Sequence, residues 1–158
     1  MITYVKAENK AYLMTKFLDT KNVSFNQVGN DQILLRYADV LLMYAEALNE
    51  LGYDASEGSI ALKQLNATRT RAGLTKLTAA DVPTQESFRK AILDERQKEF
   101  PYEGHRWFDL VRMGYAKSVL ATQGLNIQDY QLLFPIPQTE IEKVGDSKIL
   151  WQNPGYDN

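Results

Sequence analysis

The sequence predicts a mainly all-α protein, built from two antiparallel helical hairpins between an irregular N-terminal segment and an aromatic C-terminal tail. Apolar residues recur at helical spacing in long stretches within residues 31–122. Gly or Pro lies in the connections between these stretches, where a helix has to end. After residue 122 the pattern weakens, and Pro, Gly and aromatic residues become frequent. We therefore expect one domain over residues 1–158, with a lead-in at 1–30, the hairpins at 31–122 and the tail at 123–158.

Composition excludes several classes of function. The 158 residues are 44% hydrophobic and 24% charged, which is typical of a globular protein and excludes a wholly disordered one. A net charge of −2 gives no electrostatic footprint for nucleic acid. Cysteine is absent and histidine occurs once, which excludes thiol chemistry, disulfides and Cys/His zinc sites. Residues 1–8 lack the basic and apolar regions of a signal peptide, so we expect a protein that stays inside the cell or a piece of a longer chain.

Residues 1–30 carry no sustained period. Ala11–Leu18 predicts a strand or an extended packing segment. Asn22–Asn30 predicts a loop, because Asn, Ser and Gly favour turns.

The first helix is predicted from Asp31 to about Leu51, with Asn30 as N-cap and Gly52 at its end. Its polar positions follow one narrow stripe, and nearly every other position is apolar. We therefore expect this helix to be buried on most sides, in the middle of a helical array. The polar residues of the stripe are Arg36, Asp39, Glu46 and Glu50, and Met43 fills the gap between them.

Caps and helix breakers predict three further helices. The second runs from about Glu57 to Ala72, with Ser56 as N-cap and Gly73 after its end. Its inward stripe consists of Ile60, Ala61, Leu65 and Thr68. The third and fourth helices, and one helical turn in the tail, are predicted at Gln85–Phe100 with Thr84 as cap, at His105–Val119 and at Thr139–Lys143.

The two pairs of helices begin about 54 residues apart, at residues 31 and 85. A tetratricopeptide repeat has about 34 residues, so the pairs resemble two degenerate repeats separated by an inserted loop. About three repeats are needed for a stable stack, which leads us to expect more helices from a part of the protein outside this chain.

Glu95 and Glu99 are the candidate catalytic pair, because they continue an apolar stripe of the third helix. A glycosidase would use such carboxylates as acid and base. The simpler interpretation is that each pairs with an arginine, since a half-buried charge requires a partner. We expect the arginine pairing, and the candidate partners are Arg69, Arg71, Arg96, Arg106 and Arg112.

The remaining polar candidates have structural interpretations. We expect His105, the single histidine, to cap or hydrogen-bond the start of the fourth helix. Asp109 lies three residues after Arg106 and three before Arg112, which predicts a local ladder of ion pairs. No catalytic residue, cofactor motif or metal site is predicted.

The aromatic residues permit a carbohydrate site, because flat rings stack on sugars. We expect core packing in each case, with Trp107 or Phe108 in the core. The aromatic residues of the tail, which would otherwise line a surface, are Tyr130, Phe134, Trp151 and Tyr156.

Several segments together resemble the C-terminal part of the SusD/RagB family. They occur in the family's order and rough spacing over about residues 30–156. The segments are Leu35–Gly52, Arg69–Leu74, Glu95–Arg112, Phe134–Pro137 and Gln152–Tyr156.

The resemblance implies a surface-exposed outer-membrane lipoprotein of Bacteroidetes that captures glycans or peptides for nutrient uptake. Its partner would be a SusC-like TonB-dependent transporter, and its tetratricopeptide-like helices would serve as scaffold and transporter contact. The family has no common catalytic residue, so no enzyme activity is expected. The ligand-binding residues remain unknown, because in the family they vary and lie largely outside this portion.

Two alternatives belong to other classes. A free-standing helical-repeat module would bind a peptide in a groove and have no affinity for saccharides. A glycan-acting enzyme would show turnover and place paired carboxylates in one cleft.

Overall fold

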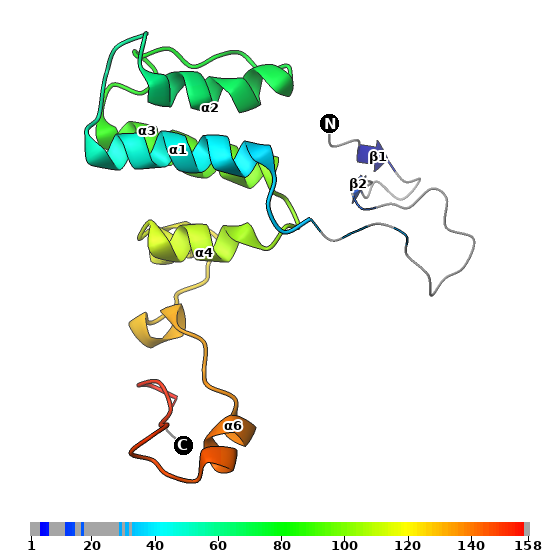
Figure 1. Ribbon diagram of the computed structural model, residues 1–158, viewed down its shortest axis with the longest axis vertical. Helices are drawn as coiled ribbons and strands as arrows, with labels where there is room; N and C mark the ends of the chain where they lie inside the picture. The colour runs from blue at the N-terminus through cyan, green and yellow to red at the C-terminus, as the bar shows by residue number, and fades with distance from the viewer. Residues whose placement is uncertain are drawn as a thin grey trace. The chain divides into compact units, whose positions relative to one another are not determined.

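The computed structural model describes residues 4–6, 12–14, 17, 29, 31 and 33–156 (Figure 1). Six α-helices account for most of the regular structure, which confirms the mainly α-helical prediction. One compact unit ends at Glu95 and the other begins at Arg96, inside the third helix. The helices are α1 (Tyr37–Leu51), α2 (Ile60–Arg71), α3 (Gln85–Glu99), α4 (His105–Arg112), α5 (Ala116–Ala121) and α6 (Gln138–Val144), with a 3₁₀ turn η1 at Asp129–Leu132. Among the described residues, no helix has the length and apolar character to cross a membrane.

A short antiparallel hairpin precedes the helices. Strand β1 (Tyr4–Lys6) pairs with β2 (Tyr12–Met14), with Val5 opposite Leu13. Of the two alternatives for Ala11–Leu18, a strand or an extended packing segment, the structure has a strand at β2, whereas β1 was not predicted. Apart from Gly29, the predicted loop at Asn22–Asn30 lies outside the described residues.

Helix α1 ends before Gly52 as predicted, but it begins at Tyr37 rather than Asp31. Arg36 occupies the N-cap position with extended backbone, φ −141° and ψ 163°, so the helical hydrogen bonds begin only after it. Asp39 lies in the first turn, where the helix dipole favours an acidic residue. The predicted cap, Asn30, lies outside the described residues.

The prediction that α1 is buried on most sides is wrong for this chain. Its buried residues are Asp39, Leu42, Ala45 and Asn49, so Asp39 of the predicted polar stripe is buried. Apolar residues of the opposite face are exposed to solvent, as expected of a helix with neighbours on one side only. They include Tyr37, Val40, Tyr44 and Leu51, together with Leu34 and Leu35 before the helix.

Helix α2 starts at Ile60, three residues after its predicted start at Glu57. The hydroxyl of Ser59, not Ser56, accepts the hydrogen bond from the backbone N–H of Leu62. Gly73 follows the end of the helix with φ 75°, as predicted for a terminating glycine. Of the predicted inward stripe, Ala61, Leu65 and Thr68 are buried, while Ile60 is exposed because at about 100° per residue it lies roughly a quarter turn from their common face.

Helices α1 and α2 lie side by side and run in opposite directions, which confirms the antiparallel hairpin predicted for them (Figure 1). Their contact, together with the first part of α3, encloses the core of this unit. Phe88 and Ile92 of α3 and Leu42 of α1 are almost inaccessible to solvent. The remaining buried apolar side chains of this unit are Ala45, Ala61, Leu62, Leu65, Val82 and Leu93.

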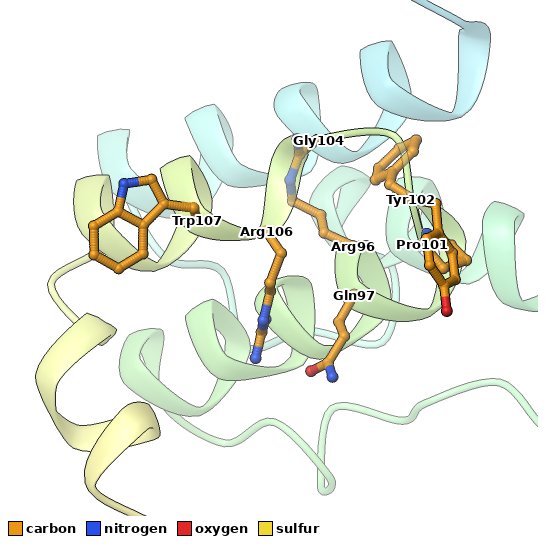
Figure 2. Close-up of a pocket in the computed structure, with 8 residues that line it drawn as sticks. Arg96, Gln97, Pro101, Tyr102, Gly104, Arg106 and Trp107 are labelled. Carbon is orange, nitrogen blue, oxygen red and sulfur yellow. The ribbon is translucent and has the colours of Figure 1, made fainter. Parts of the chain in front are cut away.

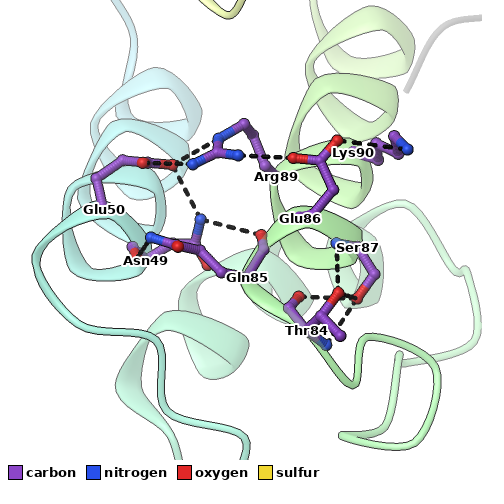
Figure 3. A network of polar contacts seen from close by, with 8 residues as sticks. All are labelled: Asn49, Glu50, Thr84, Gln85, Glu86, Ser87, Arg89 and Lys90. Atoms are coloured by element: carbon purple, nitrogen blue, oxygen red, sulfur yellow. Dashed lines mark hydrogen bonds and ion pairs between the residues drawn. The ribbon is translucent and has the colours of Figure 1, made fainter.

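Polar contacts join the end of α1 to the start of α3 (Figure 3). The guanidinium of Arg89 donates to both carboxylate oxygens of Glu50, at 2.8 and 2.6 Å. This contact lowers the pKa of the Glu50 carboxyl below its ordinary value. The side-chain amide of Gln85 donates to the carbonyl of Asn49 at 2.7 Å. Thr84 caps α3 as predicted, because its hydroxyl accepts from the backbone N–H of Ser87.

The predicted fourth helix is two helices. Helix α4 ends at Arg112 because Gly114 adopts a left-handed conformation with φ 78°. The N–H of Tyr115 then donates back to the carbonyl of Leu110, and α5 starts at Ala116. The helical turn predicted at Thr139–Lys143 is confirmed as α6.

Truncation of a core residue tests the packing of α1 and α2. Leu65→Ala should lower the free energy of unfolding by about 2–5 kcal/mol, because it leaves a cavity in a fully buried position. Leu51→Ala is the matched control, since Leu51 is 87% exposed. Urea unfolding followed by circular dichroism measures both, and equal stability of the two variants would contradict the assigned core.

Candidate functional site

Glu95 is buried and paired, as the sequence predicted. Its carboxylate lies 3.0 Å from the guanidinium of Arg69 on α2 and accepts a second contact from the hydroxyl of Thr68. Only 2% of the Glu95 surface is exposed. A carboxylate held between two α2 side chains and closed off from solvent is not placed to exchange protons with a substrate.

Asp109 carries a second buried ion pair. Its carboxylate lies 2.8 Å from Arg96 of α3, with both side chains 4% exposed. Arg112 approaches the other carboxylate oxygen from the next turn of α4, at 2.8 Å. The Arg112 part of the predicted local ladder is confirmed, whereas the pairing with Arg96 was not predicted. Each oxygen of the Asp109 carboxylate therefore accepts charge-assisted hydrogen bonds from a different arginine.

The predicted cap at His105 is wrong. Gly104, with φ 82°, occupies the N-cap position of α4, and no side chain caps the helix. The His105 ring instead packs against Phe100, with centroids 5.0 Å apart. The Arg96 guanidinium lies over the same Phe100 ring at 5.0 Å. The histidine therefore packs at the α3–α4 turn, and the second predicted carboxylate, Glu99, is also buried there.

A pocket of about 440 Å³ lies at the turn between α3 and α4, lined entirely by residues of the second unit. Figure 2 shows Gln97 and Arg106 extending toward the same side, between Trp107 at one end and Tyr102 and Pro101 at the other. We call it the α3–α4 pocket. Its lining residues are Arg96, Gln97, Phe100, Pro101, Tyr102, Gly104, Arg106 and Trp107.

Tyr102 has an unusual backbone for a residue with a side chain. Its φ of 62° lies in the left-handed region, and 82% of its surface is exposed. Strained residues of this kind concentrate at functional sites. The pocket thus offers hydrogen-bond donors and aromatic faces, but it contains no nucleophile with a neighbouring base. It suits binding rather than catalysis.

The C-terminal segment forms a hydrogen-bonded clasp. The side-chain amide of Gln152 accepts from the N–H of Ile136 and donates to its carbonyl, at 2.7 and 2.8 Å. The amide of Asn153 donates to Phe134, and the hydroxyl of Tyr156 donates to Leu133. Gln152–Tyr156 therefore anchors the chain end to Leu133–Ile136.

The aromatic residues of α4 and of the tail are less buried than predicted. Phe108 and Trp151 are exposed and Trp107 is half-buried, so the expected core position of Trp107 or Phe108 is wrong. Trp107 instead meets Phe134, with ring centroids 6.2 Å apart. Tyr130 packs edge-on against Tyr156 at 5.0 Å. These contacts hold the tail together and do not form a row of stacking platforms.

Sequence reasoning missed Gln97 and Tyr102 of the α3–α4 pocket. Gln97 looks like any polar helix residue, and nothing in its spacing marks it. Non-helical backbone at Tyr102 could have been predicted, because Pro101 and Gly104 lie on either side of it and interrupt the helix. Within the described part of the chain, no group of three or more acidic or histidine side chains is arranged to hold a metal ion.

Comparison with known proteins places the chain in a family. The SusD family model matches residues 3–156. The chain is 36% identical over 140 residues to SusD-like protein P2 of Formosa agariphila, covering 81% of this chain and 26% of that protein. It is 31% identical over 147 residues to the starch-binding protein SusD of Bacteroides thetaiotaomicron, covering 87% and 24%.

A solved structure agrees with the sequence matches. The crystal structure of a SusD-like protein from Bacteroides fragilis superimposes with a TM-score of 0.67 and 29% identity, over 92% of this chain and 30% of that one. The chain belongs to the SusD family. It spans about a quarter of the length of the curated relatives that it matches.

Removing the Asp109 carboxylate tests the buried pair. Asp109→Ala should destabilise the protein by about 3–5 kcal/mol, because the buried Arg96 guanidinium loses its counter-charge. The exposed pair of Glu140 with Lys143 provides the control, and Glu140→Ala should change stability by less than about 0.5 kcal/mol. Thermal unfolding measures both, and a silent Asp109→Ala substitution would refute the structural role.

Gly155 tests the C-terminal clasp. Its φ is +89°, and a Cβ there would overlap the ring of Tyr130. Gly155→Ala should therefore destabilise by about 1–3 kcal/mol and alter the near-ultraviolet signal of the tyrosines. At Gly58 a Cβ meets nothing within 4 Å, so Gly58→Ala is the matched control. Identical spectra and unfolding midpoints for both variants would contradict the clasp.

Proposed function

We propose that this chain is the scaffold portion of a cell-surface protein that binds glycans, or peptides, for nutrient uptake. The full-length protein would be an outer-membrane lipoprotein that works with a SusC-like TonB-dependent transporter. Residues 1–158 would form one C-terminal domain of it. Family membership and the quarter-length match to a starch-binding relative support the glycan class.

The observation that carries the scaffold role is how the matched segments use their polar residues. Glu95, Asp109 and Gln152 are the most chemically suggestive members of those segments, and each is bonded within its own unit. Polar groups that are already satisfied have little capacity left for a ligand. These segments therefore support packing, and the main ligand site would lie in parts outside this chain.

The exposed face of α1 supports the same proposal. Contiguous apolar surface is uncommon on a monomer and indicates a contact. We propose that the helical hairpins act as degenerate tetratricopeptide units and that the rest of a full-length protein covers this face. About three quarters of the length of these relatives lies outside the matched region and is available to supply such helices. The face comprises Tyr37, Val40, Tyr44 and Leu51, with Leu34 and Leu35.

Two measurements test the proposal. Calorimetry of this chain with starch oligosaccharides should show no binding tighter than about millimolar, and an assay for new reducing ends should show no hydrolysis. The full-length protein, tagged and recovered from outer membranes, should co-purify with a TonB-dependent transporter.

Each outcome can overturn part of the proposal. Micromolar binding of a starch oligosaccharide by this chain would overturn the scaffold role, and Tyr130→Ala and Trp151→Ala would then locate the site. Release of reducing ends, lost in Glu95→Gln, would make the protein an enzyme. Recovery from the outer membrane without any transporter would remove the uptake function and favour a free-standing interaction module.

A further inference from the structure

A groove of about 660 Å³ runs between α2 and the loop at residues 73–81, within the unit that ends at Glu95. We call it the α2 groove. Its charged lining is unbalanced, with three cations and one carboxylate. The cations are Lys63, Arg71 and Lys76, and the carboxylate is Glu57. The apolar lining comprises Leu62, Ala67 and Leu77.

The loop wall of the groove is fixed to α2. The side-chain amide of Asn66 donates to the carbonyl of Leu77 and accepts from its N–H, both at 2.8 Å. Arg69 donates to the carbonyl of Thr75 at 2.9 Å, and Glu57 accepts from the N–H of Ala79 at 2.7 Å. The loop turns back along α2 (Figure 1). Because these contacts hold the loop at three places, the groove is already formed before a ligand binds, which reduces the entropy lost on binding.

The two lysines of the groove are available to a ligand. Lys63 and Lys76 are exposed, and neither forms an ion pair with any residue that the structure describes. Lysine is among the residues least often buried, so a longer chain is not expected to cover them with apolar surface. The groove therefore differs from the exposed face of α1, whose apolar side chains favour burial.

Spacing along α2 defines the shape of the ligand. Lys63, Ala67 and Arg71 lie on one face, at intervals of four residues. At about 1.5 Å per residue, Lys63 and Arg71 are about 12 Å apart along the axis. An extended peptide advances about 3.3 Å per residue, so side chains four positions apart span about 13 Å. Two carboxylates in such a peptide would reach both cations, with apolar residues over Ala67.

We propose that the α2 groove binds an acidic polypeptide segment in extended conformation, with carboxylates against its cations. No aromatic side chain lines the groove, so it lacks the stacking platform that a saccharide ring would use. The groove is thus a docking site for an acidic protein segment. This inference stands independently of the glycan and transporter functions.

The experiment uses the whole chain and a fluorescent peptide with two glutamates four positions apart in an Ala/Leu background. Fluorescence anisotropy should show saturable binding that weakens as salt concentration rises. Lys63→Gln/Lys76→Gln should weaken it by about tenfold, because one carboxylate loses its charge-assisted contact with Lys63 and the groove loses a second positive charge at Lys76. The matched control, Lys98→Gln/Lys148→Gln, removes the same charge from exposed positions outside the groove and should bind like the parent.

Further controls distinguish binding at the α2 groove from nonspecific electrostatic attraction of any anion. A peptide with glutamine in place of both glutamates should not bind. Equal binding of that peptide, equal weakening by the control variant or no saturable binding would overturn the proposal. Stronger binding of a sulfated oligosaccharide of similar charge would also overturn it, because the groove would then prefer an acidic glycan.

Discussion

Charges buried among helices must be neutralised by neighbours, and the fold of this chain depends on that constraint at the C-terminal half of α3. Glu95 meets Arg69 and Thr68 of α2, while the next residue, Arg96, meets Asp109 of α4. Consecutive helix residues point in different directions, so adjacent opposite charges serve different partners. An unpaired ion at either position would cost several kcal/mol, so the first pair holds α3 to α2 within one unit and the second holds α3 to α4 within the other.

The same constraint explains why chemically suggestive residues form no catalytic site. A buried carboxylate already bonded to arginine stabilises packing and has little freedom to transfer protons. The clasp of Gln152 on Ile136 uses a neutral side chain in the same way. The surfaces available for recognition are those whose exposed side chains are not used up in buried ion pairs or in the clasp. They are the α3–α4 pocket with its exposed Tyr102, the α2 groove with its lysines, and the apolar face of α1.

Helices and most of their ends could be predicted from the sequence, because caps and terminating glycines act locally. Thr84, Gly52 and Gly73 ended or began helices as expected. Burial was harder to predict than helix ends. The spacing of apolar residues does not show which side of α1 has neighbours in this chain, because most of the length of its relatives lies outside it. The pairing of Arg96 with Asp109 and the left-handed Tyr102 depend on the α3–α4 turn, whose path no local pattern specifies.

A double-mutant cycle on Arg69 and Glu95 tests most directly the claim that these charges build the scaffold. Arg69→Met, Glu95→Gln and the double variant would be compared with the parent in urea unfolding. The structure predicts a coupling energy above about 1 kcal/mol, because the carboxylate is buried and lies 3.0 Å from the guanidinium. Additive effects of the two substitutions would show that the charges act independently and would contradict the account.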